Sequence, residues 1–268
     1  MRPTANLRSF FTTFRVALRS GIESRLNLVF LLMNTVVVMG VLFVVFQSAF
    51  AKTGSIHGVT FAAAIWSLSM YSIAWGFGAR NMYGDTSDGI ENGSIETRLV
   101  RPQHYLSYIA AFRLGKQFTF FILQIIVNLA LLFWLVGLPP VSGSIAWWLS
   151  ILTLFAGGML LSIFIYSCIG LTAFWIQNPM PVMWIVDKSV MILGGSFVPI
   201  ALLPVAVRRF SEWSPFGAIM SFSQAFTPDF EARFWSLFIP QLVWIVHIGL
   251  LLMVLWTQGR KKIAINGG

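Results

Sequence analysis

The chain has 268 residues, of which 57% are hydrophobic, 15% aromatic and only 10% charged. Soluble domains carry about 25% charged residues, so this composition excludes a soluble enzyme, and its apolar content excludes a disordered chain. The remaining class is an all-α polytopic membrane protein whose surface is mostly covered by lipid. The net charge of +9 is explained by cytoplasmic loops rich in Lys and Arg, and no nucleic-acid partner is expected.

The N-terminal segment, residues 1–27, predicts an amphipathic helix that lies in the membrane interface. Apolar residues recur there at helical spacing, and basic residues fall between them. The apolar positions are Leu7, Phe10, Phe11, Phe14, Leu18 and Ile22, and the basic ones are Arg8, Arg15 and Arg19. We expect this helix to precede a membrane domain over residues 28–268.

Six long apolar runs follow, each near the roughly 20 residues that one membrane crossing requires. They are Leu28–Phe46, Gly58–Ala79, Phe118–Leu138, Ile145–Ile176, Met183–Val207 and Phe234–Trp256. If both termini are cytoplasmic, 14 of the 18 Lys and Arg residues fall in inside segments and 4 in outside segments. This bias follows the positive-inside rule, so the sequence predicts six crossings with both ends in the cytoplasm.

The loop between the second and third runs, residues 81–112, predicts a short amphipathic helix. Asn92-Gly93 is a turn signal, Ser94 is a candidate N-cap, and Glu96 sits where a helix dipole favours a carboxylate. Apolar residues give the helix one face, and Pro102 stops it. Two interpretations stay open: an ordinary interfacial loop, or a docking element for a cytoplasmic partner.

The fifth run is interrupted by glycine and proline. The breaking residues are Gly194, Gly195, Pro199 and Pro204, and a Pro215-Phe216 pair follows them. Proline removes a helical hydrogen bond, and broken backbone at membrane depth persists only where protein or water satisfies it. We expect a fifth helix that ends early, followed by short re-entrant helices on the outer side. Either this is a kinked helix with a loop, or it forms an outer gate for substrate.

Asp187 and Lys188 lie within the fifth run, and Asp187 is the only acidic residue in any of the six runs. Neighbouring residues do not share a helix face, so we do not expect these two to pair. Instead, Lys188 should reach toward the cytoplasmic interface and Asp187 should favour the positive start of the helix. Uncharged polar residues in the other runs, such as Gln124 and Gln241, are expected to hydrogen-bond neighbouring helices.

Catalytic arrangements are missing from the sequence. The three histidines are isolated, and no H-E-x-x-H, G-x-S-x-G or G-x-x-x-x-G-K-[ST] motif occurs. The single cysteine, Cys168, cannot form a disulfide or a cysteine metal site within one chain. No enzymatic activity or bound cofactor is therefore expected on this chain.

Three segments together resemble the ABC-2 family of six-helix ABC transporter permeases. They are the N-terminal helix running through IESRLNLVF, the loop GIENGSIETRLVRPQHYLSY, and the late segment GGSFVPIALLP followed by SPFGAI. The Arg-Pro pair in the loop and the Gly/Pro-broken fifth helix carry most of the resemblance. The closest branch consists of bacterial permeases.

The resemblance implies a mechanism in which a separate cytoplasmic ATPase, which holds ATP and Mg²⁺, drives this chain. The loop helix would be the coupling helix that docks on that ATPase, and the N-terminal helix would be the connecting helix. The residues implied are Ser94, Ile95, Glu96, Thr97, Arg98, Leu99 and Arg101 for docking, and Phe10, Phe14, Arg15 and Arg19 for the connecting helix. The first, second and fifth helices of two permease subunits, identical or related, would line the path.

The expected function is thus export of an apolar or amphipathic substrate across a bacterial inner membrane. Two alternatives stay open. A self-contained channel or secondary transporter would need intramembrane ionisable groups or inverted repeats, and the sequence offers only Asp187-Lys188. A membrane enzyme or a non-transporting assembly subunit would act without ATP, but it would need a paired acid and base.

Overall fold

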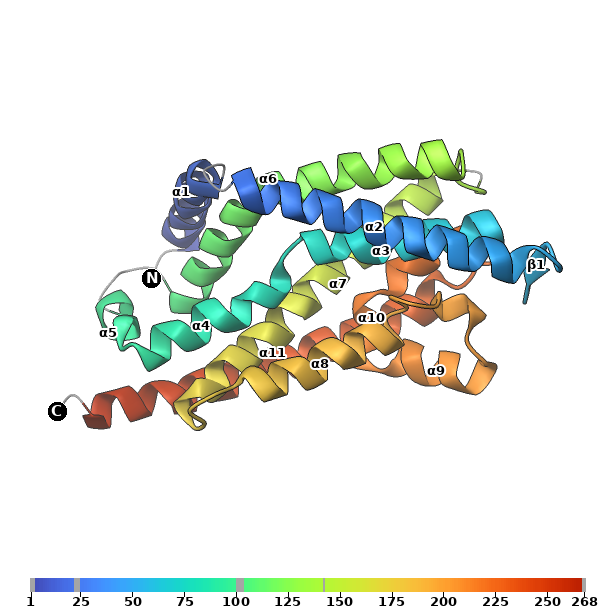
Figure 1. Ribbon diagram of the computed structural model, residues 1–268. Coiled ribbons are helices and arrows are strands. Elements are labelled where there is room, and N and C mark those ends of the chain that lie inside the picture. Colours follow the sequence, from blue (N-terminus) through green and yellow to red (C-terminus); the bar gives the residue numbers. More distant parts are fainter. Residues whose placement is uncertain (1–2, 22–24, 100–103, 142, 267–268) are drawn as a thin grey trace.

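The computed structural model describes residues 3–21, 25–99, 104–141 and 143–266, and almost all of its regular structure is helical (Figure 1). The α-helices are α1 (Pro3–Gly21), α2 (Arg25–Phe50), α3 (Phe61–Gly76), α4 (Met82–Glu91), α5 (Ser94–Leu99), α6 (Tyr105–Leu135), α7 (Ile145–Leu171), α8 (Met180–Leu193), α9 (Val205–Trp213), α10 (Pro215–Ile219) and α11 (Phe234–Asn266). Short 3₁₀ helices are η1 (Ala79–Asn81), η2 (Thr172–Phe174), η3 (Ile200–Leu202) and η4 (Ser221–Phe226). This all-α architecture agrees with the composition.

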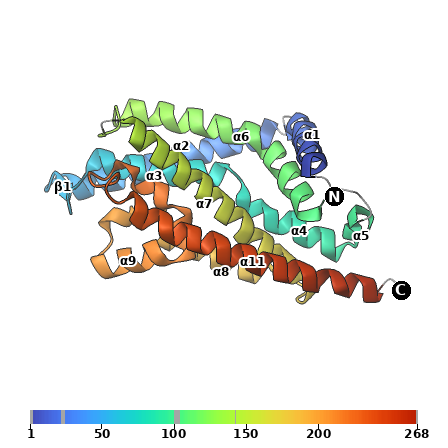
Figure 2. The ribbon, with the colours of Figure 1, turned by 180° about the vertical axis from the view of Figure 1, so that it is seen from behind.

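The long helices run side by side along one axis, which gives the molecule two ends (Figures 1 and 2). One end carries α1, α4, α5 and the last turns of α11, and we call it the α5 end. The other carries α9 and a small hairpin, and we call it the β1 end. The hairpin pairs β1 (Ser55–Ile56) with β2 (Val59–Thr60), antiparallel. Both residues between the strands have positive φ, which is the geometry of a tight type I′ turn.

Four described helices are long and apolar enough to cross a membrane: Leu32–Phe50, Tyr105–Leu135, Ile145–Phe174 and Phe234–Ile263. The second and fifth predicted runs give shorter helices, α3 of 16 residues and α8 of 14. At about 1.5 Å per residue, each of the two falls short of the roughly 30 Å of a hydrocarbon core. The predicted count of six spanning helices therefore does not appear as six continuous helices.

Glycine explains where these two helices stop. Gly78 adopts a φ of 72°, and the chain turns there from α3 through η1 into α4. Gly195 has a φ of 83°, just after α8 ends. A residue with a Cβ adopts such positive φ values at a cost, so glycine ends a helix here easily. Both runs continue as bent, composite segments.

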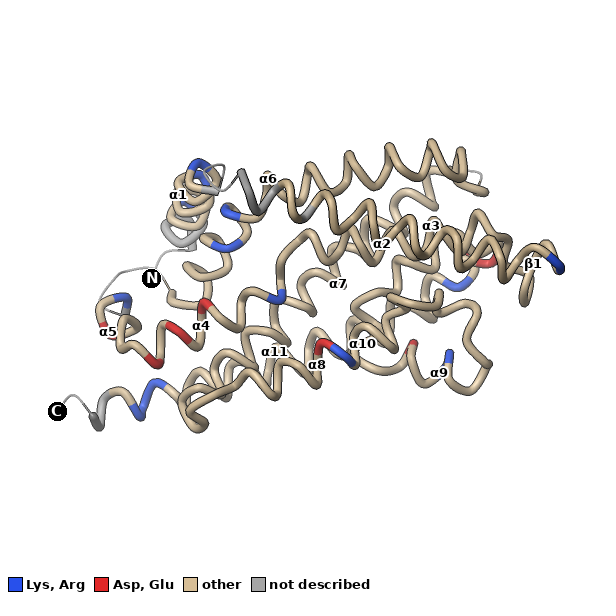
Figure 3. The backbone as a smooth tube through the Cα atoms, in the orientation of Figure 1, with Lys and Arg blue, Asp and Glu red and all other residues tan. Residues whose placement is uncertain are grey.

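The core gathers around α3, which is buried on almost every side because α2, α6 and η4 pack against it. By contrast, α2 packs on α3 and α6 and leaves most of its valine-rich surface exposed. The pair α7 and α11 forms a second packed layer. Charged residues concentrate toward the two ends of the molecule, apart from a few on η1 and α8 (Figure 3). An apolar middle with charged ends is the expected shape of a bundle that sits in lipid.

Residues 82–91, which the sequence suggested were loop, form the helix α4. Its Thr86 and Tyr83 pack against α7 so closely that a Cβ on Gly170 would contact both. On its other side, Asp85 pairs with Arg113 of α6. The loop between the second and third runs is thus a packed pair of helices, α4 and α5.

Candidate functional site

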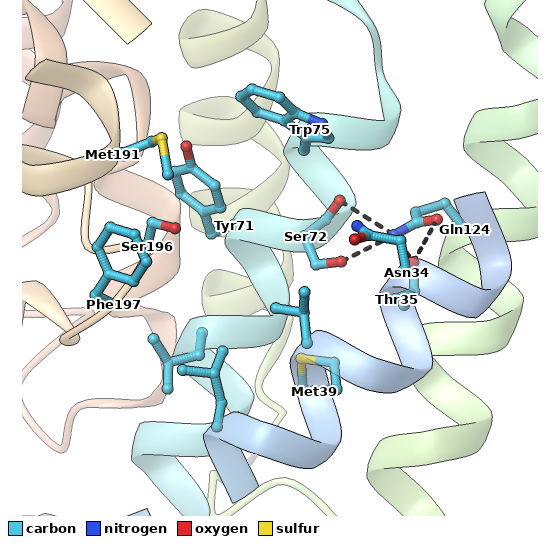
Figure 4. A pocket seen from close by; sticks show the side chains of 13 residues that line it. Asn34, Thr35, Met39, Tyr71, Ser72, Trp75, Gln124, Met191, Ser196 and Phe197 are labelled. Atoms are coloured by element: carbon cyan, nitrogen blue, oxygen red, sulfur yellow. Dashed lines mark hydrogen bonds between the residues drawn. The ribbon is translucent and has the colours of Figure 1, made fainter. Parts of the chain in front are cut away.

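A cavity of about 260 Å³ lies between α2, α3 and the end of α8 (Figure 4). Its lining includes Asn34 and Val38 from α2, Tyr71 and Trp75 from α3, and Met191 and Phe197 from the broken fifth segment. Val38 and Phe197 keep 43% and 57% of their surface exposed, so the cavity opens toward the outside of the bundle. The first, second and fifth predicted runs therefore meet at one cavity.

Gln124 of α6 closes the back of the cavity with a polar contact. Its Nε2 donates to Thr35 Oγ1 at 2.7 Å and to Ser72 Oγ at 2.8 Å (Figure 4). Gln124 is almost completely buried, and a Cβ on Gly76 would lie within 2.7 Å of its side chain. The prediction that this residue hydrogen-bonds neighbouring helices is confirmed. The amide fixes α2, α3 and α6 relative to one another, so the cavity has a defined back wall.

A partly buried ion pair joins the second and fifth segments. Arg80 of η1 pairs with Asp187 of α8, and Tyr166 of α7 donates its hydroxyl hydrogen to the same carboxylate at 2.5 Å. Asp187 is 5% exposed, and the Arg80 guanidinium also lies over the ring of Trp75 at 5.4 Å. The expectation that Asp187 serves the start of its helix was wrong, because the residue lies two turns in and has a cation from another segment. The available signal was an arginine directly after the second apolar run and an aspartate within the fifth.

Lys188, next to this pair, points away from it. The residue is exposed, and its Nζ lies 3.6 Å from the sulfur of Met191, which lines the cavity. Among the described residues, no carboxylate forms an ion pair with Lys188. The two neighbours therefore do not pair with each other, as the sequence predicted, and the lysine charge stays uncompensated beside the cavity.

The predicted breaking residues each end or start a short element beyond α8. Gly194 is the C-cap of α8, Pro199 and Pro204 precede η3 and α9, and Pro215 is the first residue of α10. Ser214 caps α10 by accepting the Gly217 N–H at 3.0 Å. Gly195 lies at the bend that follows α8, and Phe216 lies in the first turn of α10. The fifth helix does end early, and short helical segments follow it.

Two of these short segments, α10 and η4, are buried and pack against α7 and α11, whose side chains satisfy part of their backbone, whereas α9 is mostly exposed. Trp147 donates to the Ala225 carbonyl at 2.8 Å, and Gln241 donates to the carbonyls of Ala218 and Leu154, each at 2.9 Å. Leu154 lies nine residues after the start of α7, so Ala218 sits roughly 14 Å along that helix. Broken backbone at such depth requires protein partners of this kind.

Enlarging Gly158 should dislodge this segment, because a Cβ there would strike the Ile219 backbone oxygen. We expect Gly158→Leu to lower the melting temperature of the purified protein by about 5 °C, as overpacking typically costs about 1–3 kcal/mol. Gly40→Leu is the matched control, since no atom lies within 4 Å of a Cβ at that position of α2. Equal melting temperatures for the two variants would contradict the packing described here.

At the α5 end, α5 presents two different faces. Ile95 is 2% exposed and packs inward, and the Arg98 guanidinium lies over the ring of Tyr108 in α6 at 5.2 Å. Glu96 and Thr97 are exposed to solvent. Ser94 begins the helix, and the side chain that accepts a backbone N–H there is Asn92, whose Oδ1 accepts from Ser94 at 2.9 Å.

The last two predicted docking residues lie at the end of this helix and after it in the sequence. Leu99 is the last residue of α5, and Arg101 lies outside the described residues. A mixed groove lies beside α5, lined by Ile95, Glu96, Phe174 and Lys262. The exposed face of α5 therefore borders the C-terminal end of α11.

The N-terminal helix α1 lies against α6 near the same end (Figure 1). Phe14 packs edge-on against Phe118 with ring centroids 5.6 Å apart, and Phe10 is partly buried. Arg15 and Arg19 are exposed and line a shallow surface groove. The apolar face of the predicted amphipathic helix is thus partly covered by protein, and its basic face stays open.

Gly115 of α6 permits this close packing, because a Cβ there would contact the backbone oxygen of Phe14. Gly115→Leu should therefore move α1 away from α6. We expect a short bis-maleimide to link cysteines at positions 14 and 118 far less efficiently in this variant, tested in a Cys168→Ser background. Gly84→Leu, at an α4 position with free space, should leave the cross-link unchanged; undiminished linkage in Gly115→Leu would disprove the contact.

No metal site emerges: across the described ranges, no three His, Cys, Asp or Glu side chains gather closely enough to hold an ion. The long apolar helices and the charged ends define a multi-pass α-helical membrane protein. A family model described as ABC-2 family transporter protein matches residues 36–267. The chain belongs to this family, whose members are membrane transport subunits that associate with an ABC ATPase. No curated protein matched the chain.

Proposed function

We propose that this chain is the permease subunit of an ATP-driven exporter in a bacterial inner membrane, moving an apolar or amphipathic substrate. The match to the ABC-2 family over residues 36–267 carries this proposal. The chain itself has no nucleotide-binding P-loop, so ATP and Mg²⁺ would bind to the partner ATPase. The Lys and Arg residues gathered at the α5 end favour a cytoplasmic position for that end and for both termini.

Six crossings would form if the two composite segments are counted. The second would combine α3, η1 and α4, and the fifth would combine α8 with the buried segments that follow it. The depth of Ala218 beside α7 supports re-entrant helices that enter from the β1 end. Gly194, Gly195, Pro199 and Pro204 would let this part of the chain act as an outer gate.

The coupling route would run along the continuous chain from α5 through α4 to η1, and then across the ion pair between Arg80 and Asp187. The α5 helix would dock on the ATPase through Glu96 and Thr97, with α1 as a second contact. A push on α5 would reach α4, which continues directly into η1 and Arg80. Arg80 would carry the movement to Asp187 in α8. Both walls of the cavity could thus respond to ATP hydrolysis.

A second permease subunit, identical or related, would complete the path. The cavity opens at the bundle surface between two exposed apolar faces, those of α2 and α8. Val41 and Ile185, for example, are 57% and 69% exposed. Either lipid or a second subunit can cover such faces. Because this chain lines the path from one side only, a second subunit is needed to close it.

Co-expression with an ABC ATPase encoded beside the permease gene tests the proposal. We expect the two proteins to co-purify and the complex to move substrate in liposomes only with ATP, with an ATPase lacking its catalytic glutamate as the control. Solute flux from the permease alone, driven by an ion gradient, would instead support a self-contained channel or secondary transporter. Turnover of a lipid or peptide without ATP would support a membrane enzyme.

A further inference from the structure

The cavity between α2, α3 and α8 has a mostly apolar lining, and two cations lie next to residues that line it: Arg80 beside Trp75 and Lys188 beside Met191. Val38, Met39, Leu42 and Leu68 supply apolar lining, and Trp75 lies at the end nearer to Arg80. Residues 28–79 contain a single charged residue, Lys52, and that residue lies in the exposed turn before β1. The walls that α2 and α3 contribute are therefore uncharged.

Three charged groups lie beside the cavity, and they do not cancel. The Asp187 carboxylate already binds Arg80 and Tyr166, and its side chain is only 7% exposed. The Arg80 side chain keeps 37% of its surface open, and Lys188 is exposed. Two cations and one buried carboxylate leave one positive charge in excess, and the accessible groups are both cations.

A cation in the membrane-spanning part of a protein is costly unless it meets a counter-charge, water or a ligand. The carboxylate of the neighbouring Asp187 already pairs with Arg80. Among the described residues, the hydrogen-bond partner of the Lys188 Nζ is the sulfur of Met191, which is a weak acceptor. Lys188 lines a neighbouring surface groove with Trp184 and Ile185, and its Nζ reaches the rim of the cavity only at Met191. There the ammonium is in a position to take an anionic group. An apolar tail could then continue along Val38 and Leu42.

We propose that this cavity binds anionic amphiphiles, with Lys188 and the open side of Arg80 holding a carboxylate or phosphate and the apolar lining holding the acyl chain. The inference rests on the proposed function, because it names the substrate class of the same path. A volume of about 260 Å³ is below the roughly 300–1,000 Å³ of typical ligand sites. The cavity would accordingly hold the headgroup region and one chain segment.

Binding of 11-(dansylamino)undecanoic acid and of its methyl ester, measured at pH 8 in phosphatidylcholine nanodiscs, tests this. The carboxylic acid is mostly ionised at that pH and the ester is neutral, so the two probes differ in charge. The readout is saturable dansyl emission excited through tryptophan, with empty nanodiscs subtracted. We expect the acid to bind at least ~10-fold more tightly than the ester, the gain from about 1.4 kcal/mol of charge attraction.

Substitutions distinguish binding through Lys188 from non-specific partitioning of the probe into the lipid. Lys188→Gln should remove the preference for the acid, Lys188→Arg should keep it, and Lys52→Gln should leave it unchanged. Lys188 is exposed, so these variants should fold, and an unaltered melting temperature would verify that. Equal affinity for acid and ester in the parent protein, or an undiminished preference in Lys188→Gln, would overturn the proposal.

A second arm identifies the source of the anion. If the site takes a bilayer lipid, replacing phosphatidylcholine by phosphatidylglycerol should displace the dansyl acid from the parent and not from Lys188→Gln. If it takes a free amphiphile, the acid should bind in both lipids. These measurements use the permease alone, so they can succeed although no ATPase co-purifies, and the two proposals can fail separately.

Discussion

Replacing Asp187 by Asn should cost this protein about 1.5–3 kcal/mol of stability, the range for hydrogen bonds to a charged group, because the Arg80 side chain is 37% exposed and water can partly replace its counter-charge. The change keeps the shape of the side chain but leaves the Arg80 guanidinium without its counter-charge and weakens the acceptor for Tyr166. In a chain of this size, such a loss should lower the melting temperature by about 5–10 °C. Thermal unfolding followed by fluorescence-detected size-exclusion chromatography measures it.

The matched control is Asp229→Asn. Asp229 also pairs with an arginine, Arg233, but at 3.6 Å and with 54% of its side chain exposed. Such pairs contribute at most about 1 kcal/mol, so this variant should melt close to the parent. The double variant Arg80→Gln with Asp187→Asn should be less damaged than the sum of its single changes, because no unpaired charge remains. Strict additivity would show that the two residues do not act as a pair.

The sequence predicted the parts of this structure that depend on local chemistry. Gly194-Gly195 and the prolines that follow within ten residues together favour the end of a helix, so the early end of α8 could be predicted. Amphipathic spacing likewise predicted α1, and Gln124 could be assigned to helix contacts because an amide in an apolar run needs partners.

Features that depend on distant contacts could not be predicted. Met82–Glu91 has few strong helix signals of its own, and it is helical because Thr86 packs on Gly170 of α7. The Arg80–Asp187 pair joins residues 107 positions apart, so no local pattern indicates it. Arg98 was expected to face a partner, but Tyr108 from the following helix takes one side of its guanidinium.

Replacing residues 90–101 by a Gly/Ser linker should abolish binding of the partner ATPase, whereas Glu96→Arg should weaken it while the fold survives. Glu96 is exposed on the open face of α5 and forms no ion pair with another described residue, so its reversal breaks no such pair in the part of the chain that the structure describes. If that face docks in a groove complementary to the carboxylate, an arginine creates like-charge contact that costs several kcal/mol. At 1.4 kcal/mol per factor of ten, ATP-driven transport should fall at least ~10-fold.

Charge reversal at Lys52 is the control for Glu96→Arg, since that lysine is exposed near β1 at the opposite end. Lys52→Glu should leave co-purification and transport unchanged. Arg98→Glu should affect both the docking face and the packing on Tyr108, so its melting temperature should fall together with transport, whereas that of Glu96→Arg should not. Normal assembly and transport by the linker variant would rule out docking through α5 and would transfer the coupling role to α1, whose exposed Arg15 and Arg19 offer the neighbouring surface.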